Sequence, residues 1–392
     1  MATQSLSYAP VDAARAGREL AVVIFANLGF YHLARLRALA QTWPIKAIEL
    51  AAQQKLYGWE VDKTGYDVVT LHKGAFEERR NFWGRLKLTW LLLRELNAIK
   101  PAALLIPGYS DLCSIGAAVW GKLHQARTVM MFESTEIDRR RVWYRELVKR
   151  ILVKCLFDFG FVGGQRTSDY LAKLGMPTHR IVRAYDVVDN TFFARGADHL
   201  RSTSSHDEWG LPKDYFLYVG RLAPEKNLEL LLRSFHKYVE RGGRWPLVLV
   251  GKGPLETELR STSGRLGLNG RVHFAGFKNG SELFPYYAFA SCFILPSVRE
   301  PWGLVVNEAM AAGLPVVVSE RCGCAPELVH DGVNGYKIDP QDEESLAQRL
   351  LSTSLLPLES IAAMGHASRK IVAGLGPEQW AASITQVLLR QN

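Results

Sequence analysis

The chain has 392 residues, of which 48% are hydrophobic and 22% charged, and its formal net charge is +9. This length exceeds what one compact core can use, and it indicates two domains of similar size. The composition excludes a disordered or fibrous protein, and we see neither a secretory leader nor the ~18–20 apolar residues that span a bilayer. Five cysteines, few and odd in number, are typical of the cytoplasm, where we expect the protein.

The positive charge is confined to the first half of the chain. Residues 1–200 contain 28 lysines and arginines against 19 acidic residues, whereas residues 201–392 contain 20 of each kind. Such asymmetry suggests that the first half meets an anionic partner, either a membrane surface or a phosphorylated substrate. Nucleic acid is the third anionic candidate, but no nucleic-acid-binding motif is present, so we expect no such partner.

Short apolar runs alternate with helix-like segments along the chain. This alternation predicts an α/β fold of two doubly wound, Rossmann-like domains that face a central cleft. A polar stretch at residues 198–209 suggests a linker, with the domain boundary at residue 200. A helix is expected at residues 31–41, directly after the first strand. The predicted strands of the first half are residues 20–25, 46–50, 67–71, 102–106, 128–132 and 158–162, and the last of these comes directly before a helix-like segment at residues 165–173. Those of the second half are residues 216–219, 247–250, 272–274, 292–295 and 316–318.

The segment from Glu300 to Glu308 is the most informative part of the sequence. It follows an apolar strand and leads into a helix-like run, so Glu300 lies just before the helix and Glu308 about two turns inside it, at ~1.5 Å rise per residue. Between them, the backbone N–H groups of Gly303, Leu304 and Val305 would be helix-start donors suited to a phosphate. This arrangement suits a nucleotide sugar, because the carboxylates can bind its hydroxyls and the backbone amides its diphosphate. Either glutamate alone would be an ordinary helical acid.

Further motifs accompany this loop in a fixed order. They are YVGRLAPEKNL at residues 218–228, LVLVGKGP at 247–254, VHFAGF at 272–277, PELV at 326–329 and DGVNG at 331–335. With the paired glutamates, they make residues 215–340 resemble the retaining glycosyltransferases of the GT-B fold. The resemblance is closest to glycosyltransferase family 4, the glycosyl transferases group 1.

This resemblance implies an enzyme that moves a hexose from a nucleotide diphosphate sugar to an acceptor, a lipid-linked or polysaccharide precursor, with retention of configuration. It implies an acceptor-binding domain at residues 1–200, a donor-binding domain at residues 201–375 and a final helix, residues 376–392, that packs back on the first domain. No Asp-x-Asp motif is present, so we expect no metal ion and no other cofactor. Cys322 and Cys324 have no second pair of ligands nearby and indicate a turn rather than a zinc site.

Several residues are candidates for donor binding and catalysis. Arg221 and Lys226 would stabilise the negative charge that grows on the leaving diphosphate, although alone they would be surface cations. The resemblance implies that Glu300 contacts hydroxyls of the transferred sugar and Glu308 the ribose, which makes Glu300, Arg221 and Lys226 the catalytic candidates. The other donor-binding candidates are Gly29, Gly220, Gly251, Lys278, Gly303, Leu304 and Val305.

The acceptor side departs from the family's pattern. Many relatives have a histidine after the strand predicted at residues 128–132, and this chain has Glu133 there. Either Glu133 makes the polar contact instead or the chemistry on the acceptor side differs. His32, close in sequence to the first loop, could supply an imidazole, but a lone loop histidine is more often solvated.

Two segments combine cations with aromatic residues. Residues 139–154 predict an amphipathic helix with Arg141, Arg145 and Lys149 on one side and Trp143, Leu147 and Ile151 on another, and residues 79–90 form a second such stretch. Helices of this kind can lie peripherally on an anionic membrane surface, here the inner face of the cell membrane. The alternative is a core-packed helix with a solvated basic face.

The sequence also allows other functions. One is a soluble glycosyltransferase that acts on a small-molecule acceptor, and another is a non-catalytic partner subunit that binds a nucleotide sugar. UDP, GDP and ADP sugars are all candidate donors.

Overall fold

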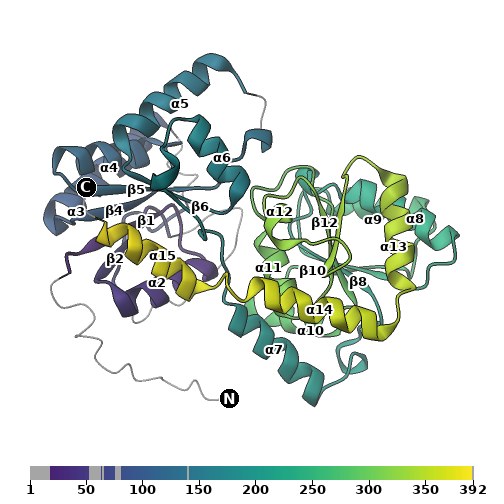
Figure 1. The fold of residues 1–392 in the computed structure, drawn as a ribbon. Coiled ribbons are helices and arrows are strands. Elements are labelled where there is room, and N and C mark those ends of the chain that lie inside the picture. Colours follow the sequence, from purple (N-terminus) through teal and green to yellow (C-terminus); the bar gives the residue numbers. More distant parts are fainter. Residues whose placement is uncertain (1–17, 53–62, 64–65, 76–80, 139–140, 391–392) are drawn as a thin grey trace.

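The computed structural model describes residues 18–52, 63, 66–75, 81–138 and 141–390 of the chain. It contains two α/β domains that lie side by side (Figure 1). The first has a seven-stranded sheet of order β3-β2-β1-β4-β5-β6-β7, and the second a six-stranded sheet of order β10-β9-β8-β11-β12-β13. All strand pairs are parallel, so the predicted pair of doubly wound domains is confirmed.

The strands of the first domain agree with the predicted ones up to β6. The strand predicted at residues 158–162 directly precedes the helix Gln165–Lys173, as expected. The later strand β7 was not predicted, because two half-buried residues are too short a run to be recognised. The strands are β1 (Ala21–Phe25), β2 (Ile45–Glu49), β3 (Val68–Thr70), β4 (Ala103–Pro107), β5 (Arg127–Phe132), β6 (Phe159–Val162) and β7 (Ile181–Val182). The helices are α2 (Phe30–Thr42), α3 (Phe82–Ile99), α4 (Leu112–Leu123), α5 (Trp143–Leu156) and α6 (Gln165–Lys173).

The second domain has the five predicted strands and one more. That strand, β13, was missed because its short sequence includes polar residues and follows a turn. The strands are β8 (Phe216–Val219), β9 (Leu247–Val250), β10 (Val272–Gly276), β11 (Cys292–Leu295), β12 (Val316–Ser319) and β13 (Gly335–Ile338). The helices are α7 (Asn190–Thr203), α8 (Leu228–Glu240), α9 (Glu256–Arg265), α10 (Phe284–Phe289), α11 (Leu304–Ala311), α12 (Ala325–Leu328), α13 (Glu343–Ser354) and α14 (Leu358–Val372), followed by α15 (Pro377–Leu389).

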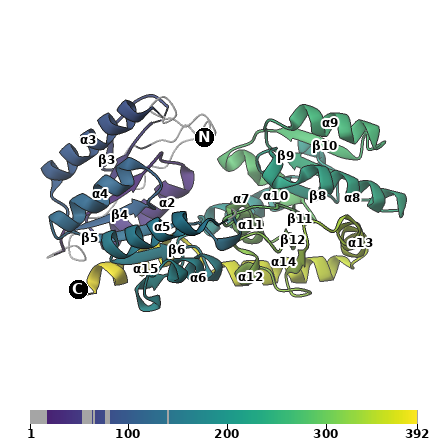
Figure 2. The same cartoon turned by 90° about the horizontal axis from the view of Figure 1, so that it is seen from above.

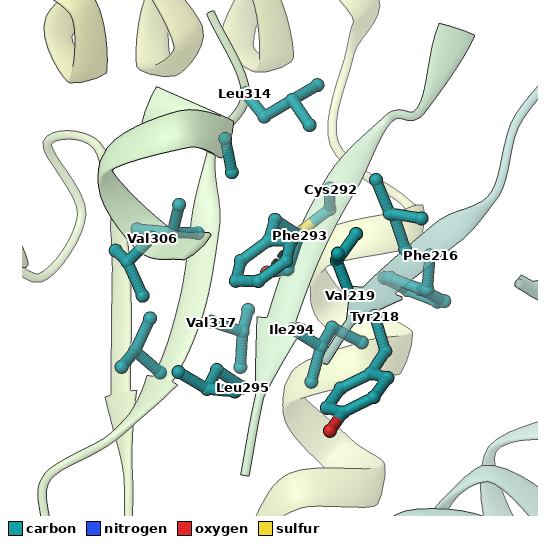
Figure 3. Close-up of a cluster of buried hydrophobic side chains, with 14 of the residues drawn as sticks. Phe216, Tyr218, Val219, Cys292, Phe293, Ile294, Leu295, Val306, Leu314 and Val317 are labelled. Atoms are coloured by element: carbon teal, nitrogen blue, oxygen red, sulfur yellow. Dashed lines mark hydrogen bonds between the residues drawn. The ribbon is translucent and has the colours of Figure 1, made fainter. Parts of the chain in front are cut away.

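The core of the second domain is formed by the central strands and the helices on both sides of the sheet. Figure 3 shows Phe216, Phe293 and Val317 from three neighbouring strands together with Val306 of α11. All four residues of β11 are buried, which is why the strand reads as an unbroken apolar run. This packing fixes the end of β11, where the loop to Glu300 begins.

The chain crosses between the domains twice. Val187 lies in the core of the first domain and Val188 in that of the second, so α7 already belongs to the second domain. The polar stretch at residues 198–209 is therefore the exposed end of α7 and the turn after it rather than a linker. At the end of the chain, α15 returns to the first domain and lies against α2 (Figures 1 and 2).

Trp380 anchors this returning helix. Its side chain is 0% exposed, and its ring centroid lies 5.6 Å from that of Phe161. We expect Trp380→Ala to lower the free energy of unfolding by about 3–5 kcal/mol, the usual cost of truncating a buried tryptophan. Trp380→Phe should cost much less, because the indole Nε1 has no hydrogen-bond partner among the described residues. Urea unfolding followed by circular dichroism measures the free energy of unfolding of both variants. An equal loss of stability in the two would contradict a contribution from the volume of the ring.

Candidate active site

The site lies where the strand order of the second sheet reverses. In this sheet β8 and β11 are neighbours although they are far apart in the sequence. Loops that follow parallel strands at such a switch point form the ligand crevice of open α/β sheets. Here the loop after β8 carries residues 220–227, and the loop after β11 carries residues 296–303.

An ion pair joins these two loops. Lys226 Nζ bonds to Glu300, and their side chains are only 15% and 13% exposed. The backbone N–H of Val298 also donates to the carbonyl oxygen of Glu225 at 3.0 Å. Arg221 pairs with Glu225 rather than with Glu300. The structure thus brings Lys226 and Glu300 together and places Arg221 beside them on the same loop.

The start of α11 offers backbone donors beside this pair. Gly303 is the N-cap residue with φ +106°, a left-handed conformation that favours glycine. Among the described residues, none accepts a hydrogen bond from the N–H groups of Gly303, Leu304 or Val305. The first N–H groups of a helix carry partial positive charge, so this end of α11 is suited to an anion.

A turn beneath the Glu300 loop holds it in place. The N–H of Gly323 donates to the carbonyl oxygen of Glu300 at 2.9 Å, and that of Cys324 to Trp302 at 3.2 Å. A Cβ at Gly323 would lie 1.7 Å from a carbonyl oxygen of the loop, so only glycine fits. Cys322 and Cys324 are buried in this turn. No group of three or more His, Cys, Asp or Glu side chains that could hold a metal ion is found among the described residues.

The glycine turns after β8 and β9 pack against each other. A Cβ at Gly251 would lie 1.9 Å from the carbonyl oxygen of Gly220, and Gly251 has φ +144°. This close approach explains a glycine at position 251 without a ligand. Lys278 follows β10 and is half-buried at the other end of the same row of strand ends.

Glu308 is buried at the junction of the domains. Its side chain is 0% exposed, and it accepts hydrogen bonds from Tyr287 Oη at 2.7 Å and from Tyr31 Oη. Tyr287 belongs to α10 of the same domain, whereas Tyr31 belongs to α2 of the first. Burial raises the pKa of Glu308 to about 7, and the two phenol hydrogen bonds oppose this rise. Neither tyrosine was identified from the sequence.

The first-domain loop after β1 is held by residues around it. The N–H of Gly29 donates to His32 Nδ1 at 2.9 Å, so His32 caps α2 instead of being solvated. Burial, with the nearby charge of Arg35, lowers the pKa of His32 to about 3, so it is neutral. Glu49, which is 0% exposed, accepts from the N–H of Leu28 at 2.8 Å and was missed by the sequence analysis.

Glu133 follows β5 and belongs to a group of carboxylates at the junction. Glu133 is exposed at the surface. Desolvation by neighbouring protein atoms, together with the charge of Glu300, raises its pKa. Asp186, only 4% exposed, has its pKa raised well above the usual value by burial and by Glu133. Arg35, which donates to the carbonyl oxygen of Val187 at 3.0 Å, is the cation that opposes these shifts. Asp186 was not identified from the sequence, because the strand before it has only two residues and marks no strand end.

Helices α3 and α5 expose apolar side chains on the outer side of the first domain. In α5 only Val153 is buried, and the predicted apolar side with Trp143, Leu147 and Ile151 is exposed instead of packing into the core. Of the two basic stretches, residues 79, 80, 139 and 140 lie outside the described residues. None of the helices in the described part of the chain has both the length and the apolar content that crossing a bilayer requires. The exposed residues are Phe82, Trp83, Leu86 and Trp90 of α3, and Trp143, Tyr144, Leu147, Val148 and Ile151 of α5.

The overall architecture matches solved structures of GT-B proteins. A sucrose-phosphate synthase from Thermosynechococcus elongatus superposes with a TM-score of 0.74 over 94% of this chain and 98% of that one, at 20% identity. HepE of Anabaena, in complex with UDP, gives 0.74 over 95% and 99%, at 18% identity. At these identities the likeness defines the fold, and the expected GT-B fold is confirmed.

The second domain carries the family signature. Residues 203–371, which make up most of this domain, match the model of the family "Glycosyl transferases group 1". An uncharacterized glycosyltransferase of Methanocaldococcus jannaschii is 41% identical over 131 residues, which are 33% of each chain. The sulfoquinovosyl transferase SQD2 of Arabidopsis thaliana is 34% identical over 161 residues, 40% of this chain and 30% of that one. The match thus spans about a third of the length of these relatives.

The raised pKa of Glu308 predicts how stability depends on pH. Between the ordinary glutamate pKa and about 7, the folded state binds a proton that the unfolded state has lost, so stability falls as pH rises through this window. We expect Glu308→Gln to lack this loss, with a stability advantage that grows from pH 5 to pH 8 to about 3 kcal/mol at most. Thermal unfolding at each pH measures it. Glu258→Gln, at an exposed position on α9, is the control, and a pH-independent difference would contradict the prediction.

Proposed function

We propose that this protein is a retaining glycosyltransferase that moves a hexose from a nucleotide diphosphate sugar to a glycan or lipid-linked acceptor and needs no metal ion. The observation that carries the proposal is the ion pair of Lys226 with Glu300 beside the N–H groups at the start of α11, from which no described residue accepts a hydrogen bond. The family of the second domain and the names of the relatives support it. The UDP in the HepE structure supports a nucleoside diphosphate as part of the donor.

The negative charge of the donor's diphosphate matches the positive groups on these loops. A diphosphate carries about two negative charges, and charge grows on it as the glycosidic bond breaks, so preorganised donors stabilise the transition state more than the ground state. Lys226, Arg221 and the start of α11 lie on adjacent loops and supply that positive potential. Glu300, held by Lys226, then meets hydroxyls of the transferred sugar, and Glu308 meets the ribose.

Retention is proposed to follow from attack on the same face from which the diphosphate leaves. The acceptor oxygen bonds to the anomeric carbon, the bond from that carbon to the phosphate oxygen breaks, and a phosphate oxygen takes the acceptor's proton. Glu300 is not assigned as a covalent nucleophile, because its carboxylate is paired with Lys226. Its charge can still stabilise the oxocarbenium character that develops on the sugar.

The acceptor is proposed to present neutral hydroxyls to the reaction centre. Glu133, Asp186 and Glu300 influence one another electrostatically, with Arg35 as the nearby cation. An anionic acceptor group would be repelled by these carboxylates, whereas sugar hydroxyls can donate hydrogen bonds to them. A glycan ring therefore fits this side better than a phosphate or a carboxylate does.

The donor site can be tested with a thermal-shift panel of UDP, GDP and ADP sugars in the presence of EDTA. We expect one nucleotide class to raise the midpoint, since a ligand at a hundredfold excess over its Kd stabilises the protein by ~2.7 kcal/mol. Lys226→Ala should abolish most of the shift and lower turnover by about 10²–10³-fold, the usual effect of removing one preorganised charge stabiliser.

Lys237→Ala is the matched control, because Lys237 pairs with Glu343 away from the site. Product analysis by NMR then reports the anomeric configuration, and an inverted product would overturn retention. If Glu300→Gln still binds the nucleotide sugar and the wild type shows no turnover with any glycan acceptor, a non-catalytic binding subunit becomes the better explanation. A shift that requires Mg²⁺ would overturn metal independence.

We further propose that the first domain binds an anionic membrane surface through α3 and α5. In α5 the exposed Leu147 and Ile151 are accompanied by the exposed cations Arg145, Arg150 and Lys154. This mixture of apolar and basic side chains is typical of helices that lie in a membrane interface. The excess positive charge of residues 1–200 supports the same orientation.

Vesicle cosedimentation tests this surface. We expect binding to vesicles that contain phosphatidylglycerol, weaker binding at high salt, and at least a roughly tenfold loss for Leu147→Glu/Ile151→Glu, because two apolar side chains no longer enter the lipid. Leu355→Glu, at an exposed leucine of the second domain, should change nothing. No binding by the wild type at low salt would favour a soluble enzyme with a small-molecule acceptor.

A further inference from the structure

Both carboxylate oxygens of Glu308 are occupied by tyrosine hydroxyls that come from different domains. Tyr287 Oη donates to Oε2 at 2.7 Å, and Tyr31 Oη donates to Oε1. The carboxylate is 0% exposed, so a ligand hydroxyl can reach it only where one of these side chains yields. The proposed function assigns the ribose to this same carboxylate.

The two tyrosines are not equally able to yield. Tyr287 is 0% exposed in the core of the second domain and belongs to α10, which packs against α7 of the same domain. Tyr31 is only half-buried and reaches Glu308 from the first turn of α2 in the other domain. A change in the spacing of the domains would therefore separate Tyr31 from Glu308 while Tyr287 stays in place.

The first turn of α2 is also tied to the second domain by a ring contact. The ring centroid of Phe30 lies 5.0 Å from that of Phe192 on α7. The same turn follows directly on Gly29, the candidate donor-loop glycine of the first domain. Tyr31 is thus connected to the candidate donor loop at Gly29 on one side and to the proposed ribose carboxylate, Glu308, on the other.

We propose that Tyr31 is a positioning residue whose hydroxyl holds the place of a ribose hydroxyl on Glu308, so that the nucleoside of the donor binds by displacing it. This inference rests on the proposed function. A phenol and a ribose hydroxyl are both O–H donors, and they compete for the same carboxylate oxygen. Displacement also shifts the first turn of α2, which links filling of the ribose position to the arrangement of the Gly29 loop.

The test is a comparison of Tyr31→Phe with Tyr287→Phe by isothermal titration calorimetry at pH 8, with circular dichroism to check folding. The ligands are UDP, GDP and ADP and their 2′,3′-dideoxy analogues. We expect Tyr31→Phe to bind the preferred ribonucleotide about tenfold more tightly, because a hydrogen bond to a charged group no longer has to be exchanged. The dideoxy analogue, which has no hydroxyl to use the vacated oxygen, should gain nothing.

Tyr287→Phe is the matched control, since it removes the other phenol from the same carboxylate without touching the domain contact. It should leave ribonucleotide binding unchanged or weaker. Equal or weaker binding by Tyr31→Phe, or an equal gain with the dideoxy analogue, would overturn the displacement. If Tyr31→Phe does not fold, Tyr31→Met applies the same comparison. Absence of nucleotide binding by the wild type and all variants would instead overturn the proposed donor site, and this inference with it.

Discussion

The ion pair between Lys226 and Glu300 joins the loops of β8 and β11 at the point where the strand order of the second sheet reverses. Removing two charges from water is costly, so a pair this buried needs support from its surroundings. The support here is the turn at residues 322–324, whose N–H groups hold the Glu300 loop from below. Under the proposed function, an incoming diphosphate would share Lys226 and leave Glu300 available to sugar hydroxyls.

Three buried carboxylates illustrate how the structure treats negative charge near the domain junction. Glu49 has an ion-pair partner in Lys63 at 2.5 Å and further donors around it. Glu308 has two phenol donors and no cationic partner in the described part of the chain, and burial raises its pKa. For Asp186 no hydrogen-bond donor is found among the described residues, and burial together with the charge of Glu133 raises its pKa well above the usual value. Arg35 is the cation that opposes this rise, so the charge of Asp186 is compensated by a neighbouring charge rather than by hydrogen bonds.

Much of the fold could be predicted because buried parallel strands leave unbroken apolar runs in the sequence. Residues 292–295 and 316–318 are of this kind, whereas Ile181–Val182 and Gly335–Ile338 are too short or too polar to stand out. The donor-loop residues could be proposed because each of them lies within a short sequence motif. Tyr31 could not, since 277 positions separate it from Glu308, and only the packing of α2 against the second domain brings them together. Asp186 and Arg35 were missed for the same reason, because their neighbours come from other parts of the chain.

The end of the chain contributes to the site although it lies far from it in sequence. Leu33 and Leu36 of α2 share one core with Ile384 and Val387 of α15, so the returning helix fixes the orientation of α2. Because α2 carries both Gly29 and Tyr31, the packing of α15 sets how closely the first-domain loop approaches Glu308. The chain crosses between the domains near residue 187 and again before α15, so any change in domain spacing would act through these segments and α2. The hydrogen bond between Tyr31 and Glu308 would register that change directly.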